Sequence, residues 1–244
     1  MKKLYFLFFI LFSFNVSAQL VQSKPSLNEN SIVKDSTGFQ YPYAIWKKLF
    51  QSGNYGMRTF VINGESPEFL IYELSEETKS KRMESIPKPR ETSFFKTGNK
   101  LPNFKLTDLN GNKFNLKELA GKVVVLNFWF INCAPCRKEI PELNKMVLKY
   151  KDIPNVVFLG VALDTKSEIK DFLKTSPFLY NISENGKWLS AFYGVNSYPT
   201  HVVVDQQATI LFHSTGLAQN TVYWVDKSIK GALSKAETES IQAK

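Results

Sequence analysis

The chain has 244 residues, 43% of them hydrophobic and 22% charged, which is typical of a globular protein and not of a disordered or collagen-like one. The formal net charge of +9 permits anionic partners, but the basic residues are scattered and no nucleic-acid motif accompanies them, so no nucleic-acid partner is expected. Two cysteines are too few for a multi-disulfide scaffold or a four-cysteine zinc site.

The amino terminus has the pattern of a secretory signal. Lys2 and Lys3 precede an apolar run over residues 4–12, and the small residues Val16-Ser17-Ala18 suit a signal peptidase. The run is too short to span a bilayer core of about 30 Å. We therefore predict a signal peptide over residues 1–18. The mature protein is expected to be periplasmic or otherwise exported, soluble and without stable membrane insertion.

The next segment, residues 19–92, predicts a flexible lead-in and a small α+β extension. Residues 19 to about 40 are polar and lack periodicity. After them we expect a short amphipathic segment over 43–50, strands over 57–62 and 69–74 joined by a turn at Asn63-Gly64, and a helix over 75–83. Nothing in the extension carries recognisable chemistry, so packing or docking is its expected role.

From residue 93 to 237 strands alternate with helices, which predicts an α/β sheet covered on both faces. We expect a β-hairpin around Asn110-Gly111, strands over 122–130, 156–163, 201–204 and 209–212, and helices over 135–150, 167–173, 187–193 and 221–233. Residues 238–244 are expected to form a tail.

The cysteine pair Cys133-Ala134-Pro135-Cys136 lies where a buried strand gives way to a helix. A helix amino terminus stabilises a thiolate on the first cysteine, and the second can attack a mixed disulfide formed there. A plain structural disulfide and half of a zinc site are the alternatives. Zinc would need His201 and His213, which have no recognisable finger spacing, so the pattern favours redox chemistry.

The stretch NFWFINCAPCRKEIPEL resembles the thioredoxin superfamily and, within it, the exported TlpA/ResA-like thiol-disulfide oxidoreductases with a redoxin (AhpC/TSA-type) domain. LPNFKLTDLNGNKFNLKELAGK upstream and GVNSYPTHVVVD downstream extend the resemblance over residues 98–235. It implies a thioredoxin-like fold, with a central mixed β-sheet flanked by helices and an N-terminal β-hairpin.

The resemblance also implies roles for single residues. Cys133 resembles the exposed nucleophile and Cys136 the buried resolving thiol, and the two would form the redox-active disulfide. Pro199 resembles the family's cis-proline, and Glu139 a carboxylate that tunes the redox site and accepts the proton of the resolving thiol. The expected substrate-binding residues are Trp129, Pro135, Tyr198 and Thr200.

At some positions the residue type differs from the one that related proteins have. Asn127 stands where cytosolic thioredoxins have a buried Asp, which fits the exported family. Asn132 replaces the Trp that often precedes the first cysteine, and Phe130-Ile131 replaces small residues, so the docking rim is expected to be unusual. His201 is expected to be an ordinary hydrogen-bonded strand histidine.

The resemblance predicts an enzyme, a thiol-disulfide oxidoreductase of the protein-disulfide reductase type, with no cofactor and no metal. Its expected partners are thiols and disulfides of exported proteins, among them apocytochrome c, and a membrane thiol electron donor. An oxidant or isomerase stays open, and a peroxidase is a weaker alternative. A copper-binding chaperone that uses both thiolates with His201 or His213 is another, because soft thiolates suit Cu(I).

Overall fold

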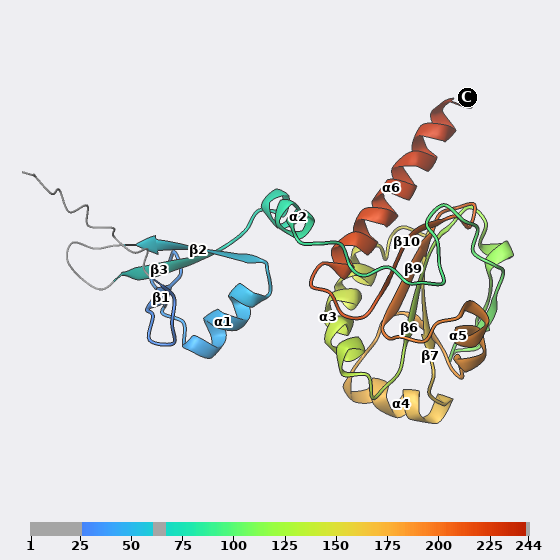
Figure 1. Ribbon diagram of the computed structural model, residues 1–244, viewed down its shortest axis with the longest axis horizontal. Helices are drawn as coiled ribbons and strands as arrows, with labels where there is room; N and C mark the ends of the chain where they lie inside the picture. Colours follow the sequence, from blue (N-terminus) through green and yellow to red (C-terminus); the bar gives the residue numbers. More distant parts are fainter. Residues whose placement is uncertain (1–25, 61–66, 243–244) are drawn as a thin grey trace, which may run out of the picture. The chain divides into compact units, whose positions relative to one another are not determined.

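The structure, a computed structural model, describes residues 26–60 and 67–242. The predicted signal peptide and the turn at Asn63-Gly64 lie outside these residues. The chain divides into two compact units, with the division between Leu74 and Ser75 (Figure 1). The predicted domain limits at residues 92 and 237 stay predictions.

In its described residues, 26–60 and 67–74, the first unit contains a three-stranded sheet and one helix. Its elements are β1 (Val33–Lys34), α1 (Tyr43–Gln51), β2 (Tyr55–Phe60) and β3 (Glu68–Glu73), with strand order β1-β3-β2. Its small core contains Val33, Trp46, Phe69 and Ile71. Val33 is fully buried and β1 pairs in parallel with β3, so ordered structure begins inside the segment that was expected to be a flexible lead-in up to about residue 40. A strand of two residues is too short to show a periodic pattern.

The second unit contains all the remaining elements. They are α2 (Glu76–Ser85), β4 (Lys105–Thr107), β5 (Lys113–Asn115), η1 (Leu116–Leu119), β6 (Val123–Trp129), α3 (Ala134–Lys149), β7 (Val156–Ala162), α4 (Lys166–Thr175), β8 (Asn181–Ser183), α5 (Lys187–Tyr193), β9 (Thr200–Val204), β10 (Ile210–Thr215) and α6 (Thr221–Gln242). The sequence did not predict β8, which has three residues. Helix α6 continues past residue 233 into the segment expected to be a tail.

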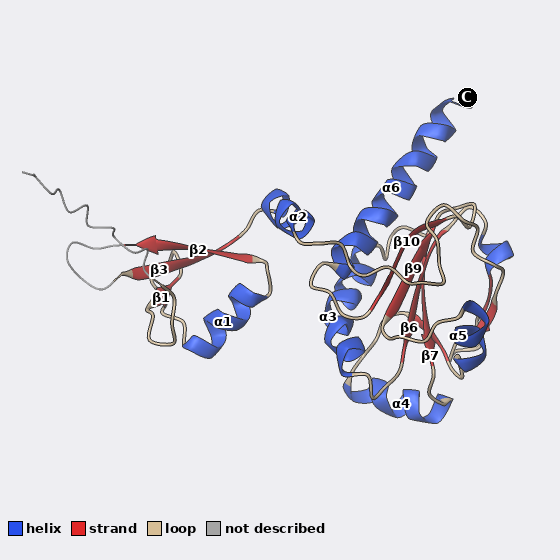
Figure 2. Cartoon of the chain, viewed as in Figure 1, coloured by secondary structure: helices blue, strands red, loops and turns tan. Residues whose placement is uncertain are grey.

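The central sheet has the strand order β10-β9-β6-β7-β8. Strands β6, β7 and β8 run parallel, β9 is antiparallel to β6, and β10 is antiparallel to β9. Helices cover the sheet on both faces (Figure 2). Every residue of β6 is buried, which explains its unbroken apolar sequence. The predicted thioredoxin-like α/β fold with an N-terminal extension is confirmed.

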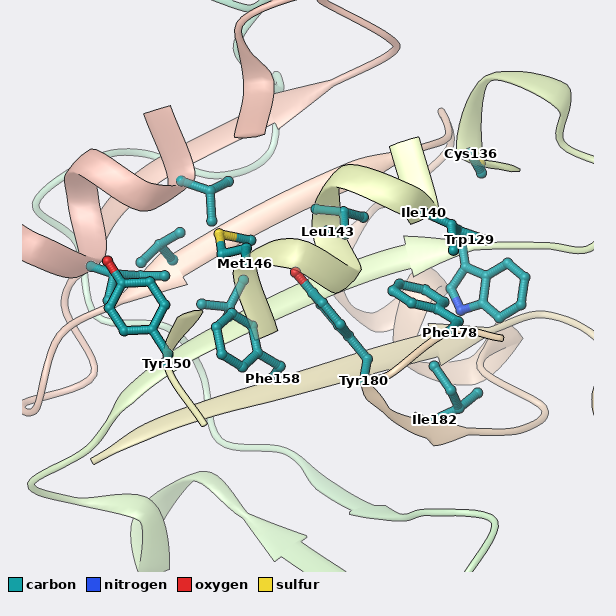
Figure 3. Packing of buried hydrophobic residues seen from close by; sticks show 14 of the residues in the cluster. Trp129, Cys136, Ile140, Leu143, Met146, Tyr150, Phe158, Phe178, Tyr180 and Ile182 are labelled. Carbon is teal, nitrogen blue, oxygen red and sulfur yellow. The ribbon is translucent and has the colours of Figure 1, made fainter. Parts of the chain in front are cut away.

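The two faces of the sheet carry separate cores. Under α3, aromatic rings from the sheet side pack against the helix, and Trp129 lies with its ring centre 5.4 Å from that of Phe178 (Figure 3). The opposite core includes Leu189 and Tyr193 of α5 and residues of the β4–β5 hairpin. Burying both faces holds β6 rigidly, and its carboxyl end leads directly to the cysteines.

Helix α2 belongs to the second unit because its carboxyl end is tied to the start of α6. The fully buried Asn220 has its side-chain amide nitrogen 3.1–3.3 Å from the carbonyl oxygens of Met83, Ile86 and Pro87, which share its two hydrogens. These bonds satisfy carbonyls that a helix end leaves without partners.

Candidate active site

The two cysteines form a disulfide at the amino terminus of α3, with their Cα atoms 5.2 Å apart. Cys133 is the N-cap residue, and its Sγ accepts a hydrogen bond from the Cys136 N–H at 3.2 Å. Pro135 occupies the first turn, where a helix needs no N–H from it. The same N–H groups and the positive end of the helix dipole would stabilise a thiolate on Cys133 once the bond is reduced.

Both cysteines are buried in this oxidised form. Cys133 is 4% exposed and Cys136 is 3% exposed. The expectation of an exposed Cys133 beside a buried Cys136 is therefore wrong for the disulfide state. The bond between the sulfurs keeps both at the edge of the core under α3, against which the half-buried Phe130, Ile131 and Tyr198 pack.

Asp164 anchors the loop in front of the cysteines. Its Oδ2 accepts the Ile131 N–H at 2.8 Å. Sequence reasoning missed this residue, although a signal was available. Asp164 follows β7, which is parallel to β6, and the carboxyl ends of adjacent parallel strands meet at one edge of a sheet.

The loop before β9 has the predicted cis-proline. The Tyr198–Pro199 peptide bond is cis, Pro199 is buried, and its carbonyl oxygen accepts the Gly216 N–H at 2.8 Å. Tyr198 is half-buried, and its ring meets that of Phe130 edge to face with the centres 5.5 Å apart. Tyr198 and Phe130 together form an aromatic rim on the core that contains the disulfide.

Two of the predicted substrate-binding residues are core residues instead. Trp129 has no exposed surface, and its ring packs between those of Phe172 and Phe178. Thr200 is also fully buried, and its hydroxyl donates to the Ser197 carbonyl oxygen at 2.7 Å. Neither side chain has surface to offer a substrate in this state, because both lie on central strands of a sheet covered on both faces. Those two assignments are corrected, while Pro135 and Tyr198 keep partly exposed surface.

Glu139 is not a solvated helix residue. It is 5% exposed, one turn after Cys136, and its Oε2 lies 2.8 Å from Nε2 of the fully buried His201. The Asn127 amide nitrogen lies 3.2 Å from Nδ1 and 3.3 Å from Nε2 of the same ring. His201 is hydrogen-bonded, as expected of a strand histidine, but its partnership with Glu139 was not predicted from the sequence.

Positive charge lies along the exposed side of α3. Arg137 and Lys138 are exposed, and they line a hollow of about 550 Å³ together with Ala134, Pro141 and Phe172. Because the hollow begins next to the cysteines, an acidic segment of a partner would be attracted to this side of the disulfide.

The two histidines do not extend the cysteine pair into a metal site. His213 is 2% exposed and its Nδ1 accepts the Thr92 N–H at 3.1 Å, while His201 is paired with Glu139. Within the described ranges, no three His, Cys, Asp or Glu side chains gather as a metal would require. Within those ranges, the two thiolates therefore have no third ligand for the copper ion of the copper-chaperone alternative.

The AhpC/TSA family model matches residues 97–213, which include the cysteines and the cis-proline. Thiol-disulfide oxidoreductase ResA of Geobacillus kaustophilus is 33% identical over 124 residues, which are 49% of this chain and 69% of that protein. The chain belongs to the ResA-like thiol-disulfide oxidoreductases. Thioredoxin-like protein YneN of Bacillus subtilis is 36% identical to this ResA-like chain over 115 residues, 46% of the chain and 68% of that protein.

ResA of Bacillus anthracis is 35% identical, and the match spans 47% of this chain and 66% of that relative, just under two thirds of its length. Solved structures agree on the fold. A putative thiol:disulfide interchange protein DsbE from Chlorobium tepidum superimposes with a TM-score of 0.52 at 28% identity, covering 57% of this ResA-like chain and 99% of that one. A putative protein disulfide isomerase from Bacteroides thetaiotaomicron has a TM-score of 0.56 at 24% identity, with coverage of 62% and 98%. The first unit of the ResA-like chain lies outside the family model.

None of the helices in residues 26–60 and 67–242 is both long and apolar enough to cross a membrane.

Proposed function

We propose that this ResA-like protein reduces disulfide bonds of exported proteins by thiol-disulfide exchange. The observation that carries the proposal is the Cys133–Cys136 disulfide at the amino terminus of α3, in the part of the chain that matches the family. The cis peptide bond at Pro199, in the loop that also holds the rim residue Tyr198, supports it.

The reaction starts from the reduced pair. The Cys133 thiolate attacks one sulfur of the substrate disulfide, a new S–S bond forms, and the other substrate sulfur leaves as a thiolate. Cys136 then loses its proton and attacks Cys133 Sγ, which releases the second substrate sulfur and closes the disulfide seen here. Two electrons pass from the cysteine pair to the substrate, and an electron donor must reduce the pair again.

The local structure favours both steps. The helix amino terminus lowers the energy of the attacking Cys133 thiolate, and Arg137 and Lys138 add positive charge on the exposed side. Only two residues lie between the cysteines, so Cys136 stays within reach of the mixed disulfide. The aromatic rim of Phe130 and Tyr198 supplies a contact surface for an incoming chain.

We further propose that the protein acts outside the cytoplasm, after removal of residues 1–18, and receives electrons from a membrane thiol carrier. The signal-like amino terminus supports this location. Apocytochrome c is the substrate we propose, because its C-x-x-C-H motif must be reduced before haem attachment. The unit that ends at Leu74 is proposed to dock partners.

The test is a single-turnover reduction. The protein is reduced, freed of reductant, and mixed with an oxidised C-x-x-C-H peptide or with an unrelated disulfide peptide, and thiols are counted after acid trapping. We expect both peptides to be reduced, the first faster. Failure with both overturns the reductase proposal, and equal rates overturn the choice of apocytochrome c.

A further inference from the structure

Three polar side chains form a row across the central sheet. Asn127 of β6 is the direct cross-strand partner of His201 of β9, which is the partner of Ser214 of β10. Direct partners point to the same face of a sheet. Val125 and Trp129, two residues to either side of Asn127, belong to the core under α3, so the row lies beneath α3.

Glu139 reaches this row from α3. Its Oε2 and His201 Nε2 are 2.8 Å apart, and the two side chains are 4% and 0% exposed. Burying an ionisable pair costs free energy that its mutual attraction often fails to recover, and an apolar pair of similar size is frequently as stable. Stability therefore does not account for this pair in the middle of a hydrophobic core.

The hydrogen bond between Glu139 and His201 can form with a neutral or with a protonated imidazole. The Asn127 amide nitrogen lies 3.2 Å from Nδ1 and 3.3 Å from Nε2 of His201, so it faces the imidazole without selecting one ring nitrogen. Nε2 is the ring atom that lies 2.8 Å from Glu139 Oε2, and a hydrogen on Nε2 is donated to the carboxylate whether the ring is neutral or an imidazolium.

Two titratable side chains near the pair are Tyr180 and Cys136. Burial raises the pKa of the Tyr180 phenol well above its ordinary value, and the charge of Glu139 adds to the effect, so Tyr180 stays protonated. Ser214 and Asn127 do not titrate. Glu139 Oε1 has no hydrogen-bond partner among the described residues. Cys136 precedes Glu139 by one turn of α3, with about 5–6 Å expected between the Cβ atoms.

We propose that His201 is a positioning residue that holds the Glu139 carboxylate beneath Cys136 and shares one proton with it, so that the pair takes the proton of the resolving thiol. In the resolving step, the Cys136 S–H bond breaks and its proton passes to the Glu139–His201 pair. The freed thiolate forms the bond to Cys133 Sγ, and the substrate sulfur leaves with the electrons of the broken mixed disulfide. Re-reduction returns the proton from the pair to Cys136.

This inference rests on the proposed thiol-disulfide exchange, but its test needs no protein substrate, because a small dithiol can reduce the Cys133–Cys136 bond. A failure here is therefore distinguishable from a failure of the proposed function. Linkage requires that, if reduction changes how tightly the pair holds its proton, the protonation of His201 depends on the redox state.

The first experiment uses the unaltered protein. The sequence contains only two histidines, so a histidine-labelled sample gives two ring signals, which are followed by NMR from acid to alkaline pH in the oxidised and the reduced protein. We expect the titration midpoint of His201 to differ between the two forms by about half a pH unit or more, a threefold change in proton affinity. His213, buried on β10 with Thr92 as its partner, is the internal control and should not change. Identical His201 curves in both forms overturn the proposal.

The second experiment follows the two chemical steps separately. Reduced protein is mixed with one equivalent of an aromatic disulfide that releases a coloured thiolate twice, first on attack by Cys133 and then on resolution by Cys136. His201→Gln keeps a donor toward Glu139 but cannot titrate. We expect it to slow the second release at least about tenfold at neutral pH and to flatten its pH profile, since general base catalysis contributes at least this much.

The matched control is His213→Asn, which removes the other buried histidine and keeps an acceptor for the Thr92 N–H. We expect this variant to release both thiolates at wild-type rates, and His201→Gln to retain the wild-type first release. A wild-type second release in His201→Gln overturns the proposal, and so does an equal slowing of both releases. If His201→Gln does not fold, the NMR titration of the unaltered protein decides.

Discussion

Reduction of the Cys133–Cys136 bond is expected to lower the free energy of unfolding, and the size of the loss follows from the loop that the bond closes. The cysteines are three residues apart, so the bond closes a loop of four residues. The loop-entropy relation gives about 6 cal/mol/K for such a loop, or about 2 kcal/mol of added stability for the oxidised form at 25 °C.

The reduced form recovers part of this difference. A Cys133 thiolate at the amino terminus of α3 gains about 0.3–1 kcal/mol from the helix dipole. The oxidised form is therefore expected to remain more stable by about 1–1.5 kcal/mol. For a unit of this size, that corresponds to a melting temperature about 3–5 °C higher.

The assay is urea unfolding of the oxidised and the reduced protein, followed by tryptophan fluorescence. Trp129, Trp188 and Trp224 report on the second unit and Trp46 on the first, so Trp46→Phe isolates the relevant transition. A reduced form more stable than the oxidised one would refute the reasoning. It would mean that thiolate stabilisation outweighs loop closure, as in a strong oxidant.

Further predictions concern single residues. Cys136→Ser should accumulate a mixed disulfide through Cys133, visible as a mass increase by the substrate peptide, and the absence of an adduct would contradict the assigned order of attack. Trp129→Ala should cost about 3–5 kcal/mol in unfolding free energy, while the folded Trp129→Phe protein keeps the wild-type KM for the disulfide peptide; a raised KM would return Trp129 to the substrate surface. Asn220→Ala should cost about 0.5–1.5 kcal/mol by removing the amide that the carbonyl oxygens of Met83, Ile86 and Pro87 share, and a change below about 0.5 kcal/mol in urea unfolding would show that water replaces it. Burial raises the pKa of the Asp226 carboxyl, but hydrogen bonds from two lysines and a tyrosine lower it more, so the pKa is below its ordinary value. The ionised carboxylate therefore stabilises the folded protein above about pH 4, and this contribution is lost in more acidic solution. Asp226→Asn should therefore be less stable than wild type at pH 7, with the difference shrinking toward about pH 2, and a difference independent of pH would count against this assignment.

Much of the fold could be predicted because the hydrophobic sequence pattern is strong in the segments that are fully buried. The run over β6 is apolar throughout and is buried on both faces, and the helix after the cysteines was placed within one residue at each end. Short elements were missed for the opposite reason. β1 and β8 have two and three residues, and pairing with a neighbouring strand defines them more than their own sequence does.

The same distinction holds for the site, where features within one segment were predictable. Spacing within one segment was enough to pair Cys133 with Cys136, and the family motif was enough to predict the cis bond before Pro199. Contacts between distant segments were not predictable in that way. The Glu139–His201 pair joins residues 62 apart in the sequence and depends on how α3 lies over β9. Burial of Trp129 and Thr200 likewise depends on what covers their strands.

The measurement that tests the account most directly is the reduction potential of the Cys133–Cys136 pair, found by equilibration with dithiothreitol or glutathione buffers and acid-trapped thiol counting. The account predicts a potential near or below about −270 mV, that of a reductant which needs an electron supply. A potential near about −120 mV, or a pair that does not cycle, would contradict it.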